Sequence, residues 1–150
     1  MTAALLPPLR GPVVATHGTF RPGQVLIHRD RIGFIDFDNF CQAEPALDLS
    51  LFFRRTKDII LDTNETGPGG GLDAQSARAT LLDRADTVCE VFLGEYEAHA
   101  RVSRQRIALW ETLDLLTLVL HSWTKVKPER LENATFALEQ HLRRLIPAHV

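Results

Sequence analysis

The sequence predicts an α+β protein that is mostly helical, with a small β-hairpin at one end of a helical bundle. Two short β-rich runs, "QVLIH" and "RIGFIDF", lie close together near the start of the chain. From residue 44 onward, apolar residues recur at helical spacing. The 150 residues are about the length of one domain, so we expect a single domain spanning 1–150.

Composition and charge favour a folded protein without a nucleic-acid or membrane partner. Hydrophobic residues make up 45% of the chain, which is enough to fill a core, and the net charge is −2 with a pI near 6.3. We interpret the short basic clusters at 54–57 and 101–106 as solvated helix faces.

Three features of the sequence predict a cytoplasmic protein. The two cysteines, Cys41 and Cys89, make no disulfide framework, and we expect both to be reduced and buried. The first residues lack the basic region of a signal peptide, and their apolar run breaks at Pro7 and Pro8. The most apolar run, "IALWETLDLLTLVLHSW", carries acidic residues that do not suit a membrane span.

The first forty residues predict strands around a loop. Residues 13–15 are expected to form a short buried strand, which leads into the loop 17–23. The hairpin is expected over Gln24–His28 and Arg31–Phe37, with its turn at Arg29 and Asp30. The turn lacks an Asn-Gly or Asp-Gly pair, so its type stays open.

The remaining residues predict helices with recognisable starts. Pro45 suits the first position of one helix, with Leu47 and Leu51 on its apolar face. A second helix is expected over 73–100, with an apolar face formed by Leu81, Ala85, Val88, Phe92, Tyr96 and His99. Ser103 can cap a third helix that runs to about Val126. This helix is apolar almost all round, so we expect it at the centre of the bundle.

Pro128 can open the last helix. Its apolar residues recur at helical spacing and are expected to face the core: Leu131, Ala134, Leu138, Leu142 and Leu145.

The loop "HGTFRPGQ", residues 17–24, has the length of a kinase catalytic loop. Kinases place a base and a metal ligand at the spacing H-x-D-x-x-x-x-N, and a second metal-binding Asp follows on a nearby hairpin. Here "IDFD" follows at 35–38 and "AEPALDLS" at 43–50. These pieces, in this order, resemble the aminoglycoside phosphotransferase and choline kinase-like family, whose members carry HGDxxxxN, a hairpin, then ID and a D/EP-x-x-DLA segment.

This resemblance implies a protein kinase-like C-terminal lobe that phosphorylates a small-molecule hydroxyl with ATP and Mg²⁺. The catalytic loop and hairpin would occupy 13–40 and the helical part 44–150, with a flexible loop at 62–72. The kinase N-terminal lobe, which holds the adenine pocket and a phosphate-binding Lys, would precede residue 13. We therefore expect that lobe to be absent from this chain.

The resemblance also implies roles for residues whose types match the family motif. Asp36 matches the main Mg²⁺ ligand, although an Asp at a strand end can also be satisfied by turn amides. Gln24 stands at the position of the second metal ligand, an Asn. Because Mg²⁺ demands near-ideal geometry, the longer Gln side chain is expected to weaken this site. His17 and Asp48 match structural residues that brace the loop.

The departure with the greatest consequence is Thr19, which stands where the family has its catalytic Asp. A Thr hydroxyl cannot act as a base near neutral pH. General-base catalysis contributes about 10²–10⁴ in rate, so we expect this isolated chain to be impaired or inactive. Asp38 is a candidate substitute base, and Arg21 can pair with a phosphate or with a surface acid.

A polar stripe interrupts the apolar third helix. Glu111, Asp114, His121 and Lys125 recur at helical spacing, so they either face solvent or line a cleft. The resemblance implies an acceptor bound against the helical lobe, where Glu111 and Asp114 would meet a cationic substrate.

Two other hypotheses remain open. One is a non-catalytic, pseudokinase-like binding or interaction module, which the Thr at position 19 favours. A lone lobe would also expose apolar surface, which invites self-association or a separate N-lobe partner. A more distant hypothesis is a helical metal hydrolase built on His17, Asp36, Asp38 and His121.

Overall fold

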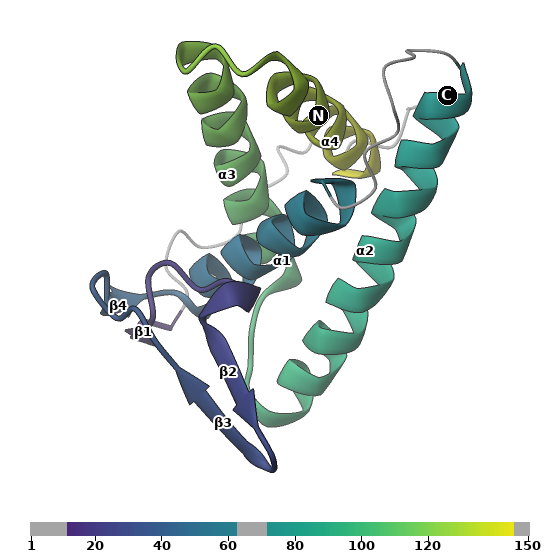
Figure 1. Cartoon of the computed structure of the whole chain (residues 1–150). Coiled ribbons are helices and arrows are strands. Elements are labelled where there is room, and N and C mark those ends of the chain that lie inside the picture. The colour runs from purple at the N-terminus through teal and green to yellow at the C-terminus, as the bar shows by residue number, and fades with distance from the viewer. Residues whose placement is uncertain (1–11, 63–71, 146–150) are drawn as a thin grey trace, which may run out of the picture.

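The computed structural model describes residues 12–62 and 72–145, and this part of the chain folds into four helices and two small antiparallel sheets. The helices gather at one end and the hairpin projects from the other (Figure 1). The predicted class, α+β and mostly helical, is confirmed. Most of the glycine-rich segment 62–72 lies outside the described residues.

The predicted hairpin forms from β2 (Val25–His28) and β3 (Arg31–Phe34), which pair antiparallel with His28 opposite Arg31. The two-residue turn needs a left-handed residue, and Arg29 takes it with φ of +53°. The second strand was expected to run to Phe37 but ends at Phe34. It ends there because Asp36 has φ of +69°, which breaks the extended backbone.

A second sheet joins β1 (Val14–Thr16) to β4 (Cys41–Ala43). The strand predicted near 13–15 forms, but the prediction that it is buried was wrong, since Val13 is 62% exposed and the buried residue is Thr16. β4 was not predicted. A three-residue strand has no periodicity to detect, and its partner is 25 residues away or more in the sequence.

The helices are α1 (Pro45–Asp62), α2 (Leu72–His99), α3 (Arg104–Thr124) and α4 (Pro128–Leu145). Their predicted starts are confirmed. Pro45 and Pro128 are the first residues of their helices, and Ser103 caps α3 by accepting the backbone N–H of Arg106 at 3.3 Å.

The main core lies where α1 meets α2 and the start of α3. Its buried members come from all three helices: Ala46, Leu49, Phe53, Cys89, Leu93 and Ile107. Burying one such leucine or phenylalanine contributes about 1.5–3 kcal/mol. The buried face of α1 differs from the predicted one. Leu47 and Leu51 are only partly buried, whereas Leu49 is 3% exposed.

Two further helix faces differ from the prediction. On α2, Val88 is 50% exposed and Cys89 takes the core position, so Cys89 is buried as expected, whereas Cys41 is exposed. On α4, Ala134 is buried, but Leu142 and Leu145 lie at the surface. Apolar residues are numerous on these helices, so the sequence pattern alone fits more than one face.

The expectation that α3 lies at the centre of the bundle was wrong. The helix at the centre of Figure 1 is α1, and α3 lies at one side of it against α1 and α4. One face of α3 is buried, whereas Leu120 is 63% exposed and Trp123 70%. None of the described helices is long and apolar enough to cross a membrane.

Candidate active-site loop

Asp48, in the first turn of α1, holds the backbone of the loop 17–24. Its carboxylate accepts the backbone N–H of His17 at 2.6 Å and of Gly18 at 2.9 Å, and that of Phe20 at 3.5 Å. Hydrogen bonds to an ionised acceptor are stronger than neutral ones, so this is a firm attachment. The loop backbone is thereby tied to the start of α1, which is itself anchored in the core.

Gly18 allows the loop to lie against the segment that follows the hairpin. Its φ is +83°, a conformation that side chains other than glycine's rarely adopt. A Cβ atom at this position would also come within 2.1 Å of the carbonyl oxygen of Asn39. Glycine is therefore required here for two independent reasons, backbone strain and space.

His17 ties the loop to the end of the hairpin. The residue is 8% exposed, and its Nε2 lies 2.8 Å from the carbonyl oxygen of Ile35, so Nε2 must carry the proton. The ring packs against Phe37 with 4.8 Å between centroids. In the neutral ring Nδ1 is then an acceptor, and it lies 3.5 Å from the hydroxyl of Thr19.

Stacked aromatic rings lie between the loop and the helices α1 and α2. Phe20 stacks on Phe52 of α1 with 5.1 Å between centroids and also contacts Phe34 of β3. Phe52 in turn stacks on Phe92 of α2 at 4.5 Å. The loop is therefore connected to the helical core as well as to the hairpin.

Gln24, Asp36 and Arg21 meet beside the loop. Gln24 is 1% exposed, and its Nε2 donates to Oδ2 of Asp36 at 2.8 Å. Arg21 lies 3.2 Å from the same oxygen, with both of these side chains partly open to solvent. The other end of the Gln24 amide, Oε1, is buried and has no hydrogen-bond partner among the described residues.

Asp38 lies two residues beyond Asp36 in the exposed segment that follows β3. Since the strand has already ended, the two carboxylates are not held on opposite faces by strand alternation. Within the described residues, no group of three or more His, Cys, Asp and Glu side chains is arranged to hold a metal ion. The metal hydrolase hypothesis therefore has no support there.

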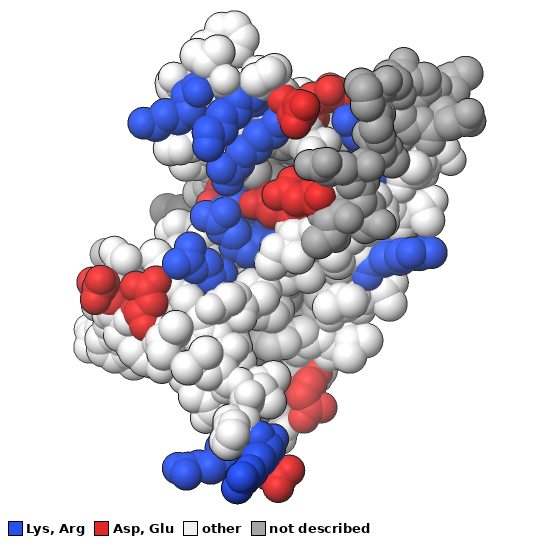
Figure 2. All heavy atoms as spheres, in the orientation of Figure 1, with Lys and Arg blue, Asp and Glu red and all other residues white. Residues whose placement is uncertain are grey.

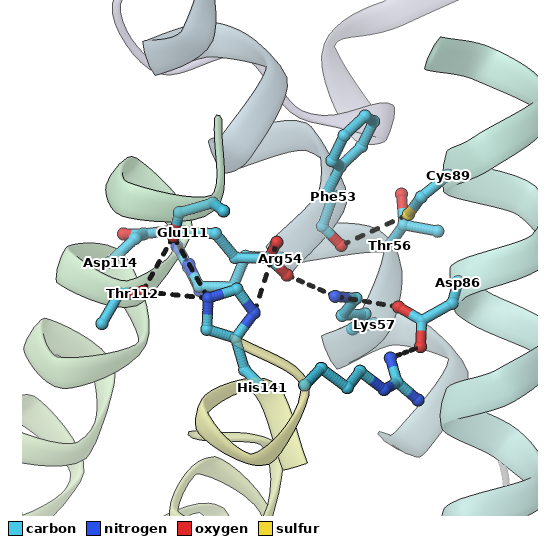
Figure 3. Close-up of polar contacts among 12 residues, drawn as sticks. Phe53, Arg54, Thr56, Lys57, Asp86, Cys89, Glu111, Thr112, Asp114 and His141 are labelled. Atoms are coloured by element: carbon cyan, nitrogen blue, oxygen red, sulfur yellow. Dashed lines mark hydrogen bonds and ion pairs between the residues drawn. The ribbon is translucent and has the colours of Figure 1, made fainter. Parts of the chain in front are cut away.

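Glu111 and Asp114 of α3 each pair with a cation of α1 rather than with a residue of the loop (Figure 3). Glu111 is 6% exposed and pairs with Lys57, and Asp114 pairs with Arg54. The expectation that Arg54 and Lys57 form a solvated face was wrong. A cationic substrate would have to displace one of these internal cations to reach either carboxylate.

Lys57 is the centre of a buried ion-pair network. It also lies 3.0 Å from Asp86 of α2, which pairs with Arg144 of α4. Burial alone would lower the pKa of Lys57, but Glu111 and Asp86 outweigh it and hold this pKa above its ordinary value. The same burial raises the pKa of the nearby Cys89 thiol to about 12.

A cavity of about 210 Å³ lies over this network rather than at the loop. It opens between α2 and α3, and Lys57, Cys89 and Glu111 line it. Sequence reasoning missed the network. The signal was present, because Arg54 and Lys57 recur on the same face of α1 as the buried Phe53 and Leu61.

The surface around the hairpin carries few charges in the view of Figure 2, apart from those at its tip and edges. Large apolar side chains are exposed here, among them Ile27, Ile32, Phe34, Phe37 and Phe40. An exposed apolar surface of this kind is uncommon on a monomeric protein.

The Asp48 carboxylate on α1 holds the loop 17–24 beside the hairpin, and Asp36 lies just past that hairpin, which is the arrangement that the family resemblance predicts. The family model described as "phosphotransferase enzyme family" matches residues 1–85. The chain therefore belongs to the phosphotransferase enzyme family. No curated protein and no solved structure matches the chain significantly.

Proposed function

We propose that this chain is the C-terminal lobe of a phosphotransferase that moves the γ-phosphate of ATP to the hydroxyl of a small molecule. The observation that carries this proposal is the loop 17–24, which Asp48 holds on α1 and His17 holds on the hairpin, next to Asp36. Phosphoryl transfer depends mainly on positioning and electrostatics, so a braced loop beside an acid is the frame it needs.

The donor atoms beside the loop suit Mg²⁺. Asp36 offers a partly exposed carboxylate, and Gln24 has a buried amide oxygen without a partner in the described structure. Turning the Gln24 amide about its last bond would place Oε1 where Nε2 now donates to Asp36. Carboxylate and amide oxygens are ligands for hard cations. When bound, Mg²⁺ would neutralise charge on the phosphates of ATP.

The remaining residues of the loop orient the reactants. The Arg21 guanidinium is exposed, and its Nη2 lies 3.2 Å from Oδ2 of Asp36, from which it can turn to a phosphate. Thr19 offers a hydroxyl in place of a base, and its proton is oriented toward Nδ1 of His17. The acceptor hydroxyl therefore lacks a strong base, unless Asp38 supplies one. We infer slow turnover for this reason.

The nucleotide needs more than the described residues supply. In kinases a Lys on a strand pairs with the phosphates. The lysines of this chain are Lys57, Lys125 and Lys127, and none of them lies on a described strand. We propose that a lobe carrying such a Lys completes the ATP site, and that it docks on the apolar surface of the hairpin.

Phosphate transfer from ATP in the presence of Mg²⁺, measured with a panel of hydroxyl acceptors, tests the proposal. We expect little turnover by the chain alone and a gain of about 10²–10⁴ for Thr19→Asp, because this change restores a base. Asp36→Ala in the Thr19→Asp background should abolish the gain. Fast turnover by the unchanged chain, or a gain that survives Asp36→Ala, would contradict it.

The second candidate function is a non-catalytic, pseudokinase-like binding module. The observation that favours it is Thr19 in the position of the base, together with an exposed apolar hairpin. Calorimetric titration with ATP and Mg²⁺ separates the two functions. Micromolar binding that is lost in Asp36→Ala supports a retained nucleotide site, whereas a chain that neither binds ATP nor gains turnover from Thr19→Asp supports the interaction module.

A further inference from the structure

The third helix presents two different apolar faces. Its inner face packs on α1 and α4 through Ile107, Leu115 and Leu118, all at most 7% exposed. A second apolar row runs along the outside of the same helix: Leu109, Leu113, Leu116, Leu120 and Trp123. These five side chains are between 45% and 70% exposed, so the described part of the chain does not bury them.

The spacing of the outer row indicates what kind of surface would cover it. Its members are four, three, four and three residues apart, which is the heptad spacing of the a and d positions in a coiled coil. The mean repeat of 3.5 residues keeps such a row aligned with another helix over several turns. A facing helix therefore fits this surface better than a strand or a loop does.

The residues beside the row indicate which helix. The flanking positions, which correspond to e and g of the heptad, hold Trp110, Thr112, Thr117, Val119 and Thr124. None of them is charged. Like charges at e and g positions can prevent two helices from pairing, and two copies of this helix have no such repulsion. The nearest acids, Glu111 and Asp114, are turned inward and paired with α1.

We propose that the outer row of α3 is a homodimer interface, in which α3 of one copy packs against α3 of a second copy about a two-fold axis. The same row then serves both subunits, as a symmetric interface requires. This inference is independent of phosphotransfer, since it uses no residue of the loop or of the metal site.

The size of the row sets the strength of the dimer. Five large side chains, each about half exposed, offer on the order of 100 Å² apiece, so two copies bury roughly 1,000 Å², near the lower limit for a specific interface. We therefore expect a weak dimer, with a dissociation constant on the order of micromolar.

Sedimentation of the whole chain over about 1 to 200 μM tests the interface. We expect the mass to rise from monomer toward dimer across this range, as weak association requires. Leu113→Asp and Leu120→Asp, each tested alone, should weaken dimerisation at least tenfold, because the dimer would bury the new charge within the outer row. Circular dichroism should show unchanged helix content, since both positions are exposed in the monomer.

Two matched substitutions serve as controls. Val91→Asp places the same charge on α2, and Ile27→Asp places it on the hairpin, at residues that are 71% and 75% exposed. Neither should change the dimer. A chain that stays monomeric at every concentration overturns the proposal. So does an assembly that Ile27→Asp or Val91→Asp dissociates while both α3 variants still form it.

Discussion

The carboxylate of Asp48 accepts the backbone N–H of His17 at 2.6 Å, although 31 residues separate the two in the chain. Asp48 belongs to the first turn of α1, and His17 begins the loop that carries the kinase-like motif. The position of the candidate active-site loop is therefore set by the start of a core helix.

Removing the Asp48 carboxylate should destabilise the protein. Asp48→Ala leaves the amides of His17 and Gly18 without their acceptor, and we expect a loss of about 3 kcal/mol in the free energy of unfolding. Urea denaturation measures it. Asp48→Asn keeps one acceptor oxygen and should cost less. The exposed Asp38→Ala is the control and should change stability by less than about 0.5 kcal/mol.

Alanine should have opposite effects at two glycines. Gly18→Ala introduces a Cβ against Asn39 at a positive φ, and we expect a loss of at least about 2 kcal/mol. Gly94 lies inside α2 with open space around it, so Gly94→Ala should raise stability by about 0.5–1 kcal/mol. Thermal denaturation of both variants measures the difference. Equal effects at the two positions would contradict the described loop geometry.

Breaking the buried pair of Lys57 and Glu111 should be costly. Lys57→Met leaves Glu111 buried without its cation, and we expect a loss of about 3–5 kcal/mol. The double variant Lys57→Met with Glu111→Leu should lose less than the sum of the two single changes, because no unpaired charge remains at that pair. Lys125→Met, at the exposed end of α3, serves as the control with little effect.

Stability should fall at alkaline pH because of Cys89 and Lys57. Burial raises the pKa of the Cys89 thiol from its ordinary value of 9.0 to about 12, so the thiol keeps its proton in the folded protein over this range. Between pH 9 and 12 the unfolded chain therefore binds fewer protons, so the free energy of unfolding decreases as pH rises. Lys57 acts in the same direction, since its raised pKa stabilises the fold below about 10.4 and that contribution is lost above it.

Denaturation at several pH values checks this expectation. Cys89→Ala should lose stability at neutral pH because it leaves a small cavity, yet its stability should fall less steeply between pH 9 and 12. Cys41→Ala is the control, because Cys41 is exposed. An identical pH slope for Cys89→Ala and the unchanged chain would show that the thiol does not contribute.

Local signals in the sequence were sufficient for the helix starts, the hairpin turn and the family motif. Each helix start depends on one residue, through the backbone geometry of Pro45 and Pro128 and through the side chain of Ser103. The turn at Arg29 lies between adjacent strands. These features depend on residues that are neighbours in the chain. The motif at 17–24 is also local, so the resemblance to the family can be read from consecutive residues without the fold.

The tertiary structure alone decided which faces are buried and which charges are paired. The sequence predicted α3 at the centre of the bundle and Lys57 on a solvated face, and both were wrong. An apolar side chain on a helix can meet the core or a second copy, and a charged one can meet water or a buried partner. Whether Lys57 is buried depends on Glu111, which lies 54 positions further along the chain. A local sequence pattern around Lys57 does not contain that partner.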